Sequence, residues 1–151
     1  MKIPRFLPRF KGIHIVSKLL TNAFSLNQAI AITIFPFVFY KNKYLKQNAR
    51  IYSHETIHIQ QQFELGLVGA VVYIMICLIT GFWLAFLPVL FLFYILYGIF
   101  YLRNKWLFKL DHMNSYRLIP FEREASRYEN LYNYVVLRRP FAWRKFLKIH
   151  L

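Results

Sequence analysis

The residues with the clearest chemical potential are two histidines four positions apart, His54 and His58, with Glu55 directly after the first. On a helix, residues four apart lie on one face, so both imidazoles can bind a single metal ion. The carboxylate of Glu55 can then act as a general base on a water molecule. Zinc in hydrolytic sites usually has three protein ligands and leaves a fourth position for water. The motif therefore predicts a Zn²⁺ hydrolase and requires a third ligand elsewhere in the chain.

The third ligand is expected among the few acids downstream of the motif. Asp111 stands alone, whereas Glu122, Glu124 and Glu129 fall within one predicted helix that begins at Pro120. Carboxylates two positions apart on a helix cannot both face one metal. We expect Glu122 to be the ligand, with Glu124 orienting an imidazole or pairing with an arginine. The reverse assignment stays open, as does simple compensation of the helix dipole by these acids.

Other polar residues near the motif are ambiguous. Gln61 and Gln62 could orient a ligand or simply hydrate the helix, and we favour hydration. His112 and Tyr116 could each donate to an oxyanion, although we favour a position at a membrane interface for both. Without a third ligand, the two histidines of the motif could equally be solvated groups on a helix surface.

A long apolar segment follows the motif, because no Asp, Glu, Lys or Arg interrupts the chain from Leu65 to Leu102. As one helix it would be about 57 Å long at 1.5 Å per residue, whereas a bilayer core needs only about 30 Å. Thr80-Gly81, followed by Pro88, offers a place for the chain to turn. We predict a transmembrane helical hairpin over residues 66–102, with a single tilted span as the alternative.

The hairpin also bears on the chemistry, because His54 and His58 precede it and Glu122 follows it. A single crossing would separate these residues across the bilayer, whereas a hairpin returns them to one side. All 20 Lys and Arg residues would then lie on that side as well. Since positive charge marks the cytoplasmic side, we expect the active site and both termini to be cytoplasmic.

Composition agrees with one membrane-embedded domain. The chain has 151 residues, 58% of them hydrophobic, and carries a formal charge of +14 from 20 basic and 6 acidic residues. The basic residues flank the apolar segment, so anionic lipid headgroups are the expected counter-ions and no nucleic-acid partner is expected. The single cysteine, Cys77, cannot form a disulfide within the chain.

The remaining segments should position the motif. Residues 29–40 are β-branched and aromatic, and predict either a short strand that Pro36 confines to a sheet edge or a half-buried interfacial segment. Asn48 or Ser53 could cap the motif helix, which we expect to begin near Arg50.

Downstream of the hairpin, residues 111–118 are expected to form a connector. Pro120 then begins a helix that runs to about Leu137. Residues 138–151 are expected to form a basic tail on the membrane surface.

Two stretches, His54-Glu-Thr-Ile-His58 and Glu122-Arg-Glu-Ala125, resemble the gluzincin metallopeptidases. The best match is to those whose third ligand opens an E-x-x-A-D pattern, including the membrane-embedded prenyl-protein and heat-shock peptidases. This resemblance implies that Glu122 is the third zinc ligand. Ser126 stands where the family has its aspartate, so the usual contact of that aspartate with a ligand side chain is in doubt.

The chain also resembles a group of short, uncharacterised membrane proteins with H-E-x-I-H-x-x-Q-Q and F-E-R-E-A motifs. The matching stretches are residues 32–37, 54–62 and 116–125, within a similarity that covers about residues 30–150. The resemblance implies a peptidase-like function with no established substrate. In zincins the strand before the motif helix lines the substrate cleft, a role that would fall to residues 29–40.

Together these features predict one mainly α domain over residues 1–151, with a membrane-embedded zincin-like helical core, a transmembrane hairpin and one short edge strand or hairpin. The expected function is that of a zinc metalloendopeptidase acting on polypeptides near the cytoplasmic membrane face. One alternative is a non-catalytic membrane protein with a structural metal. Another is a basic membrane-surface or nucleic-acid-binding protein without metal.

Overall fold

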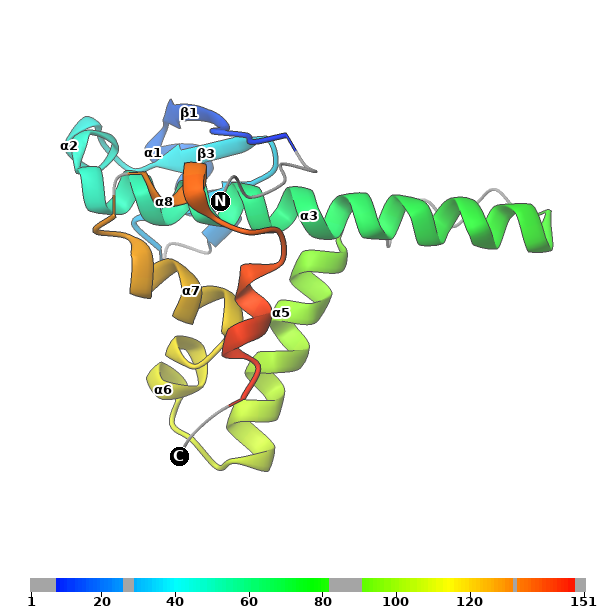
Figure 1. Ribbon diagram of the computed structural model, residues 1–151. Helices are drawn as coiled ribbons and strands as arrows, with labels where there is room; N and C mark the ends of the chain where they lie inside the picture. The colour runs from blue at the N-terminus through cyan, green and yellow to red at the C-terminus, as the bar shows by residue number, and fades with distance from the viewer. Residues whose placement is uncertain (1–7, 26–28, 82–90, 132, 149–151) are drawn as a thin grey trace.

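The computed structural model describes residues 8–25, 29–81, 91–131 and 133–148. Within them the chain is mainly helical with one small sheet, as expected (Figure 1). The elements in order are β1 (Ile13–Val16), α1 (Lys18–Ser25), β2 (Ala31–Ile34), β3 (Phe37–Tyr40), α2 (Lys43–Gln47), α3 (Ala49–Thr80), α5 (Leu92–Leu102), a π-helical turn (Arg103–Leu107), α6 (His112–Arg117), α7 (Pro120–Tyr128), α8 (Tyr134–Leu137) and a 3-10 turn (Ala142–Phe146).

Helix α3 carries the motif and is the longest element of the structure. Asn48 caps it, because its side chain accepts hydrogen bonds from the backbone N–H groups of Arg50 and Ile51. Gly81 ends it in the left-handed conformation, with φ 67°, which glycine adopts without a steric penalty. With 32 residues, α3 extends far beyond the rest of the fold (Figure 1).

The two halves of α3 have opposite surroundings. The half that contains the motif is buried and rich in polar residues, whereas the second half exposes Val71, Ile74, Leu78 and other apolar side chains. Among the described residues, α3 is the helix long and apolar enough to cross a membrane, and only 22% of its most apolar window is buried. A helix that is apolar all round normally lies in a protein core or in lipid.

The small sheet lies against the buried half of α3. Its strand order is β1-β3-β2, with β1 parallel and β2 antiparallel to β3. Residues 31–40 form the β2–β3 hairpin with β2 at the sheet edge, so of the two predicted forms the hairpin is present. Pro36 lies in its turn, after a cis peptide bond. The sequence did not predict β1. Gly12, directly before β1, lies so close to α3 that a Cβ there would be 2.9 Å from Ile59.

In the described residues, the two apolar helices α3 and α5 are not arranged as the antiparallel arms of the predicted transmembrane hairpin (Figure 1). Helix α5 runs crosswise to α3 and does not return along its apolar half (Figure 1). The expected turn, including Pro88, lies outside the described residues. One face of α5 packs in a core that brings together α3, α7 and the C-terminal segment, with Leu65, Phe93, Phe121 and Trp143 among its buried members.

The downstream segments differ from the sequence predictions in three places. Residues 112–117 form helix α6 with an Asp111 cap, and not a connector. Helix α7 ends at Tyr128, and the chain continues to Leu137 through a break and the short α8. The predicted surface tail packs inward over its described part: Arg138 is 5% exposed, and Trp143 is 8% exposed beside Phe121. Residues 149–151 lie outside the described residues.

Candidate metal centre

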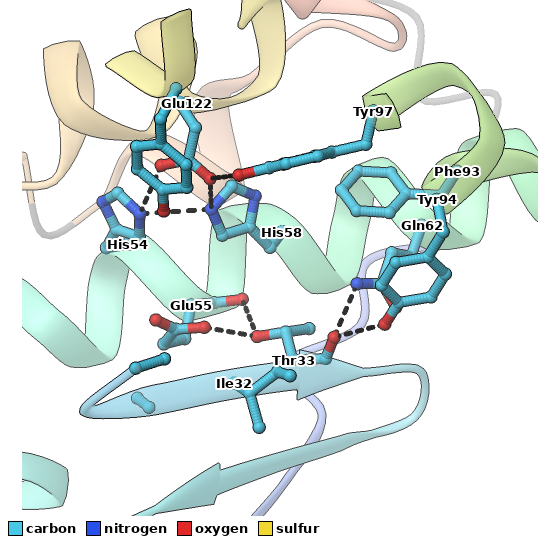
Figure 2. Close-up of a pocket in the computed structure, with 13 residues that line it drawn as sticks. Ile32, Thr33, His54, Glu55, His58, Gln62, Phe93, Tyr94, Tyr97 and Glu122 are labelled. Atoms are coloured by element: carbon cyan, nitrogen blue, oxygen red, sulfur yellow. Dashed lines mark hydrogen bonds and ion pairs between the residues drawn. The ribbon is translucent and has the colours of Figure 1, made fainter. Parts of the chain in front are cut away.

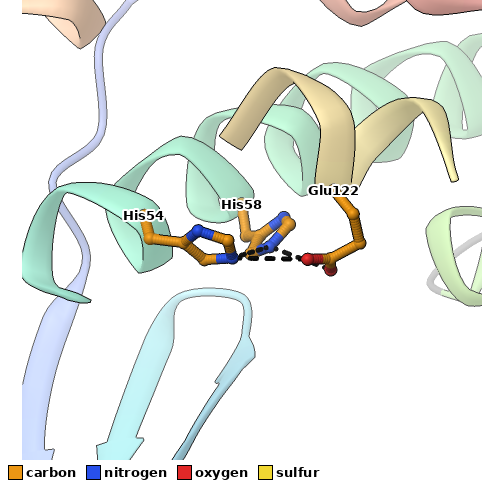
Figure 3. Close-up of side chains that lie close together, drawn as sticks. All are labelled: His54, His58 and Glu122. Carbon is orange, nitrogen blue, oxygen red and sulfur yellow. Dashed lines mark hydrogen bonds and ion pairs between the residues drawn. The ribbon is translucent and has the colours of Figure 1, made fainter. Parts of the chain in front are cut away.

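Three side chains from two distant parts of the chain converge between α3 and α7 (Figure 3). The Nε2 atoms of His54 and His58 are 3.1 Å apart. The carboxylate of Glu122 approaches both, with Oε2 3.4 Å from His54 Nε2 and Oε1 3.2 Å from His58 Nε2. The two histidines are held one turn apart on α3, and the first turn of α7 presents Glu122 to them.

These separations fit a single zinc ion. Ligands at about 2.0–2.1 Å from a tetrahedral Zn²⁺ lie about 3.3–3.4 Å from one another. The closest atoms of each pair lie 3.1 to 3.4 Å apart, with a different oxygen of Glu122 toward each histidine. One ligand atom from each of the three side chains lies within 4.8 Å of the other two, so these residues could hold one metal ion.

The ring of His58 is held in one orientation by Gln61. The amide nitrogen of Gln61 donates to the backbone oxygen of Phe121 at 3.1 Å and to Glu124 Oε2 at 2.9 Å. Its oxygen must then accept the hydrogen bond from His58 Nδ1, 2.8 Å away. With the proton on Nδ1, the lone pair of Nε2 points at the candidate metal position. The expectation that Gln61 hydrates the helix is wrong, since this side chain is fully buried.

Glu129 plays the matching role for His54. Its Oε2 lies 3.0 Å from His54 Nδ1, and a carboxylate can only accept, so Nδ1 carries the proton. Arg50 holds the other oxygen of Glu129 at 2.7 Å through its Nε. Both histidines thus turn Nε2 toward one point beside Glu122, 3.1 Å from each other, where either a proton shared with the carboxylate or a metal ion can be bound.

The carboxylate of Glu122 is buried and charged. Burial alone would raise the pKa of Glu122, but the adjacent imidazoles of His58 and His54 outweigh it and hold that pKa well below its usual range. Tyr97 from α5 donates a 2.9 Å hydrogen bond to Glu122 Oε1. Sequence analysis did not single out Tyr97, whose hydroxyl is directed at the candidate metal centre.

A cleft of about 250 Å³ opens over the three candidate ligands (Figure 2). The edge strand β2 forms one wall and the aromatic face of α5 the other, and Tyr116 of α6 lines it as well. Desolvation in the cleft and the negative charge of Glu122 raise the pKa of Tyr116, which therefore keeps its proton and can donate it in a hydrogen bond. His112 lies elsewhere and pairs with Tyr101 at 2.7 Å.

Glu55 lines the same cleft but faces the sheet. Figure 2 shows its carboxylate turned toward β2, while His54 and His58 turn toward α7. The hydroxyl of Thr33 donates to Glu55 Oε2 at 2.6 Å. The carbonyl of Thr33 is fixed in turn by Gln62 at 2.8 Å and Tyr94 at 2.6 Å. The motif glutamate is thereby oriented by a residue that sequence analysis did not single out.

The run of three glutamines after the motif joins α3 to three other elements. Gln60 bonds the backbone of the N-terminal segment at Phe10, Gln61 reaches α7, and Gln62 reaches β2 and its turn. All three side chains are buried. Consecutive helix positions point in directions about 100° apart, so the run fixes the motif helix from three sides. The repeated glutamine was the available signal, because a buried amide needs partners.

Glu124 belongs to a separate buried cluster. Arg138 contacts Glu124 Oε1 through its Nε at 2.6 Å and also binds Glu64. Burial would lower the pKa of Arg138, but the two carboxylates outweigh that effect and raise it. Tyr134 donates a further 2.8 Å hydrogen bond to Glu124. The structure therefore brings Glu122, and not Glu124, to the histidines.

Comparison with known proteins leaves the geometry as the main argument. No protein-family model matches the chain, and no curated protein or solved structure proved similar to it.

Proposed function

We propose that this protein is a zinc-dependent membrane metallopeptidase that hydrolyses peptide bonds close to the cytoplasmic membrane face. The observation that carries the proposal is the convergence of His54, His58 and Glu122, which we call the triangle; their closest atoms lie 3.1 to 3.4 Å apart in each pair and could reach one zinc ion. The hydrogen bonds to both Nδ1 atoms add to it, because they leave the two Nε2 lone pairs free for a metal.

The residues around the triangle fit hydrolysis better than a purely structural metal. Zn²⁺ bound here would polarise a carbonyl and lower the pKa of a coordinated water toward neutrality. Glu55 lines the same cleft and can accept the proton of an attacking water. Thr33 occupies Oε2 of Glu55, so the proton would arrive at Oε1. Tyr116, which stays protonated, is placed in the cleft to donate to the developing oxyanion.

The proposed membrane location rests on the second half of α3. Ile74 is 55% exposed, Leu78 71% and Ile79 79%, on a helix with a mean window hydropathy of 2.2. Exposure of such a contiguous apolar surface to water is unfavourable, whereas its contact with lipid hydrocarbon is not. The 20 Lys and Arg residues, which flank the apolar segment, support a cytoplasmic position for the folded part.

The proposed substrates are unfolded or membrane-associated polypeptides. A cleft of about 250 Å³ can admit a short extended stretch of chain and cannot admit a folded domain. Its walls combine apolar residues of β2 and α5 with the polar groups of the metal centre. Such a site suits a peptide that is presented in extended form.

Zinc analysis and proteolysis of the purified full chain test the proposal. We expect one zinc per chain and zinc-dependent cleavage of fluorescein-labelled casein in detergent. Glu55→Gln should keep the zinc and lose cleavage, whereas Glu122→Ala should lose both. Stoichiometric zinc without cleavage would favour the non-catalytic protein with a structural metal. A wild-type protein that binds no zinc would rule out the metal centre and leave a basic membrane-surface protein.

A further inference from the structure

Helix α5 carries a continuous apolar row on its outer side. The exposed members are Phe91 at its start (53% exposed), Ile95 (45%), Ile99 (53%), Leu102 (39%) and, in the following π-helical turn, Trp106 (70%). Steps of three and four residues place side chains on one helical face. We call these five residues the α5 row.

The opposite face of α5 packs against the rest of the protein. Phe93 is 6% exposed, and its ring lies 4.7 Å from that of Phe121 in α7. Tyr94 and Tyr97 donate hydrogen bonds to Thr33 and Glu122. These contacts fix the rotation of α5 about its axis, so the row cannot turn inward without breaking the candidate metal centre.

The direction of α5 is unusual for a helix beside a membrane span. Figure 1 shows α5 crosswise to α3, at the side of the folded part from which the apolar half of α3 projects. If α3 follows the bilayer normal, α5 lies close to the bilayer plane. Its outer face then meets the bilayer where α3 enters it.

We propose that α5 lies flat on the surface of an anionic phospholipid bilayer, with the α5 row inserted to the acyl-chain boundary. This inference rests on the proposed membrane location of α3. The charge pattern selects anionic lipid, because Lys105 and Lys109 are exposed on either side of Trp106 and the chain as a whole carries +14. Tryptophan and cationic side chains are the groups typical of a helix at the headgroup layer.

A flat helix and a crossing helix predict different depths. Residues of the α5 row should share one depth, about 5–10 Å into the boundary between headgroups and acyl chains. If α5 instead crossed the bilayer, Ile95 and Trp106 would differ in depth by about 16 Å, at 1.5 Å per residue.

Nitroxide labels on single cysteines can measure those depths. On a Cys77→Ala background, cysteines would replace Ile95, Ile99 and Leu102 in turn, in vesicles of phosphatidylcholine and phosphatidylglycerol. Gln47→Cys in α2 is a control for a water-exposed helix, and Ile74→Cys and Leu78→Cys report on α3. Relative accessibility to oxygen and to a water-soluble nickel complex gives the depth of each label. Only variants with the wild-type thermal melt in detergent would be compared.

The expected result is one shallow depth for all three row positions, with Gln47→Cys in water and the α3 labels in the hydrocarbon. A steady change of depth along the row would overturn the flat placement, as would labels as water-accessible as that at position 47. If the α3 labels were also in water, the proposed membrane location itself would fail. Shallow row labels in phosphatidylcholine alone, at equal vesicle affinity, would contradict the choice of anionic lipid.

Discussion

Two buried carboxylates of α7, Glu122 and Glu124, lie two positions apart and face the same helix α3, yet their surroundings differ in kind. Glu124 meets a guanidinium, that of Arg138, which also binds Glu64. Glu122 meets two imidazoles whose Nδ1 protons are already used elsewhere. The first cluster contains a permanent cation, and in the second two imidazole nitrogens and a carboxylate converge on one point.

The difference agrees with a structural role for the first cluster and with the proposed metal-binding role for the second. A buried carboxylate is tolerated when a charged partner and hydrogen bonds compensate for lost solvation. Arg138, Tyr134 and Gln61 provide this for Glu124, so that cluster is complete within the protein. The cluster around Glu122 would be equally well compensated if a divalent cation joined it. Variants that exchange or remove members of each cluster should therefore fail in different ways.

The largest effect is expected from Arg138→Met. It leaves Glu64 and Glu124 buried without their cation, which should lower the free energy of unfolding by about 3–5 kcal/mol. Thermal unfolding in detergent measures the change. Arg139→Met is the matched control, because Arg139 is exposed and should be nearly neutral. Equal melting temperatures for the two variants would show that the buried ion cluster does not hold the fold.

Next in size is the contrast between Glu122→Gln and Glu124→Gln. The first removes a charged ligand, so zinc affinity should fall more than about 100-fold, beyond the ~10–100-fold typical of residues that only orient ligands. The second should reduce stability while leaving most of the zinc affinity. Competition with a fluorescent chelator gives both constants. A larger loss of zinc from the Glu124 variant would reverse the assignment of the third ligand.

A smaller effect is expected where the two clusters are connected. Gln61 links Glu124 to His58, so Gln61→Leu should free the His58 ring and weaken zinc by about 10–100-fold. Gln60→Leu removes a buried amide that bonds the N-terminal segment and should affect stability alone. If both variants bound zinc equally, the orienting role of Gln61 would have to be abandoned.

The smallest change tests a single hydroxyl. Tyr97→Phe removes the hydrogen bond to Glu122 Oε1, worth about 0.5–1.5 kcal/mol, so zinc affinity should fall a few-fold to about 10-fold. Tyr94→Phe removes a hydrogen bond of similar type to Thr33, away from the candidate ligands, and should leave zinc affinity unchanged. The same chelator competition would reveal a reversed order, which would place Tyr94 nearer the metal than described.

The sequence predicted those parts of the fold and of the candidate site that local patterns determine. The H-E-x-x-H spacing, the Asn48 cap and Pro120 at the start of α7 are local, and each predicted its element. Sequence analysis preferred Glu122 to Glu124 as the third ligand, and the resemblance to a known pattern supported that choice, but by spacing alone either carboxylate could face α3. The packing of α7 against α3 settles the position of Glu122.

What the sequence could not predict involves contacts between distant segments. Arg138 appeared to be part of a surface tail, because its two carboxylate partners lie at positions 64 and 124 and no local pattern connects them. Tyr97 and Glu122 are 25 positions apart, and no local pattern predicted the hydrogen bond between them. Strand β1 pairs with β3 in parallel, a pairing that a short strand cannot signal on its own.

Because α3 is one continuous helix, it sets the distance between the candidate metal centre and the proposed membrane segment. Leu67, the first exposed large apolar residue of α3, is nine positions after His58, and at 1.5 Å per residue this is about 14 Å. An extended chain covers that height in about four residues, at roughly 3.3 Å each. If the proposed peptidase acts on a protein anchored in the same bilayer, the scissile bond would therefore lie in the juxtamembrane stalk of that protein, a few residues outside its own span.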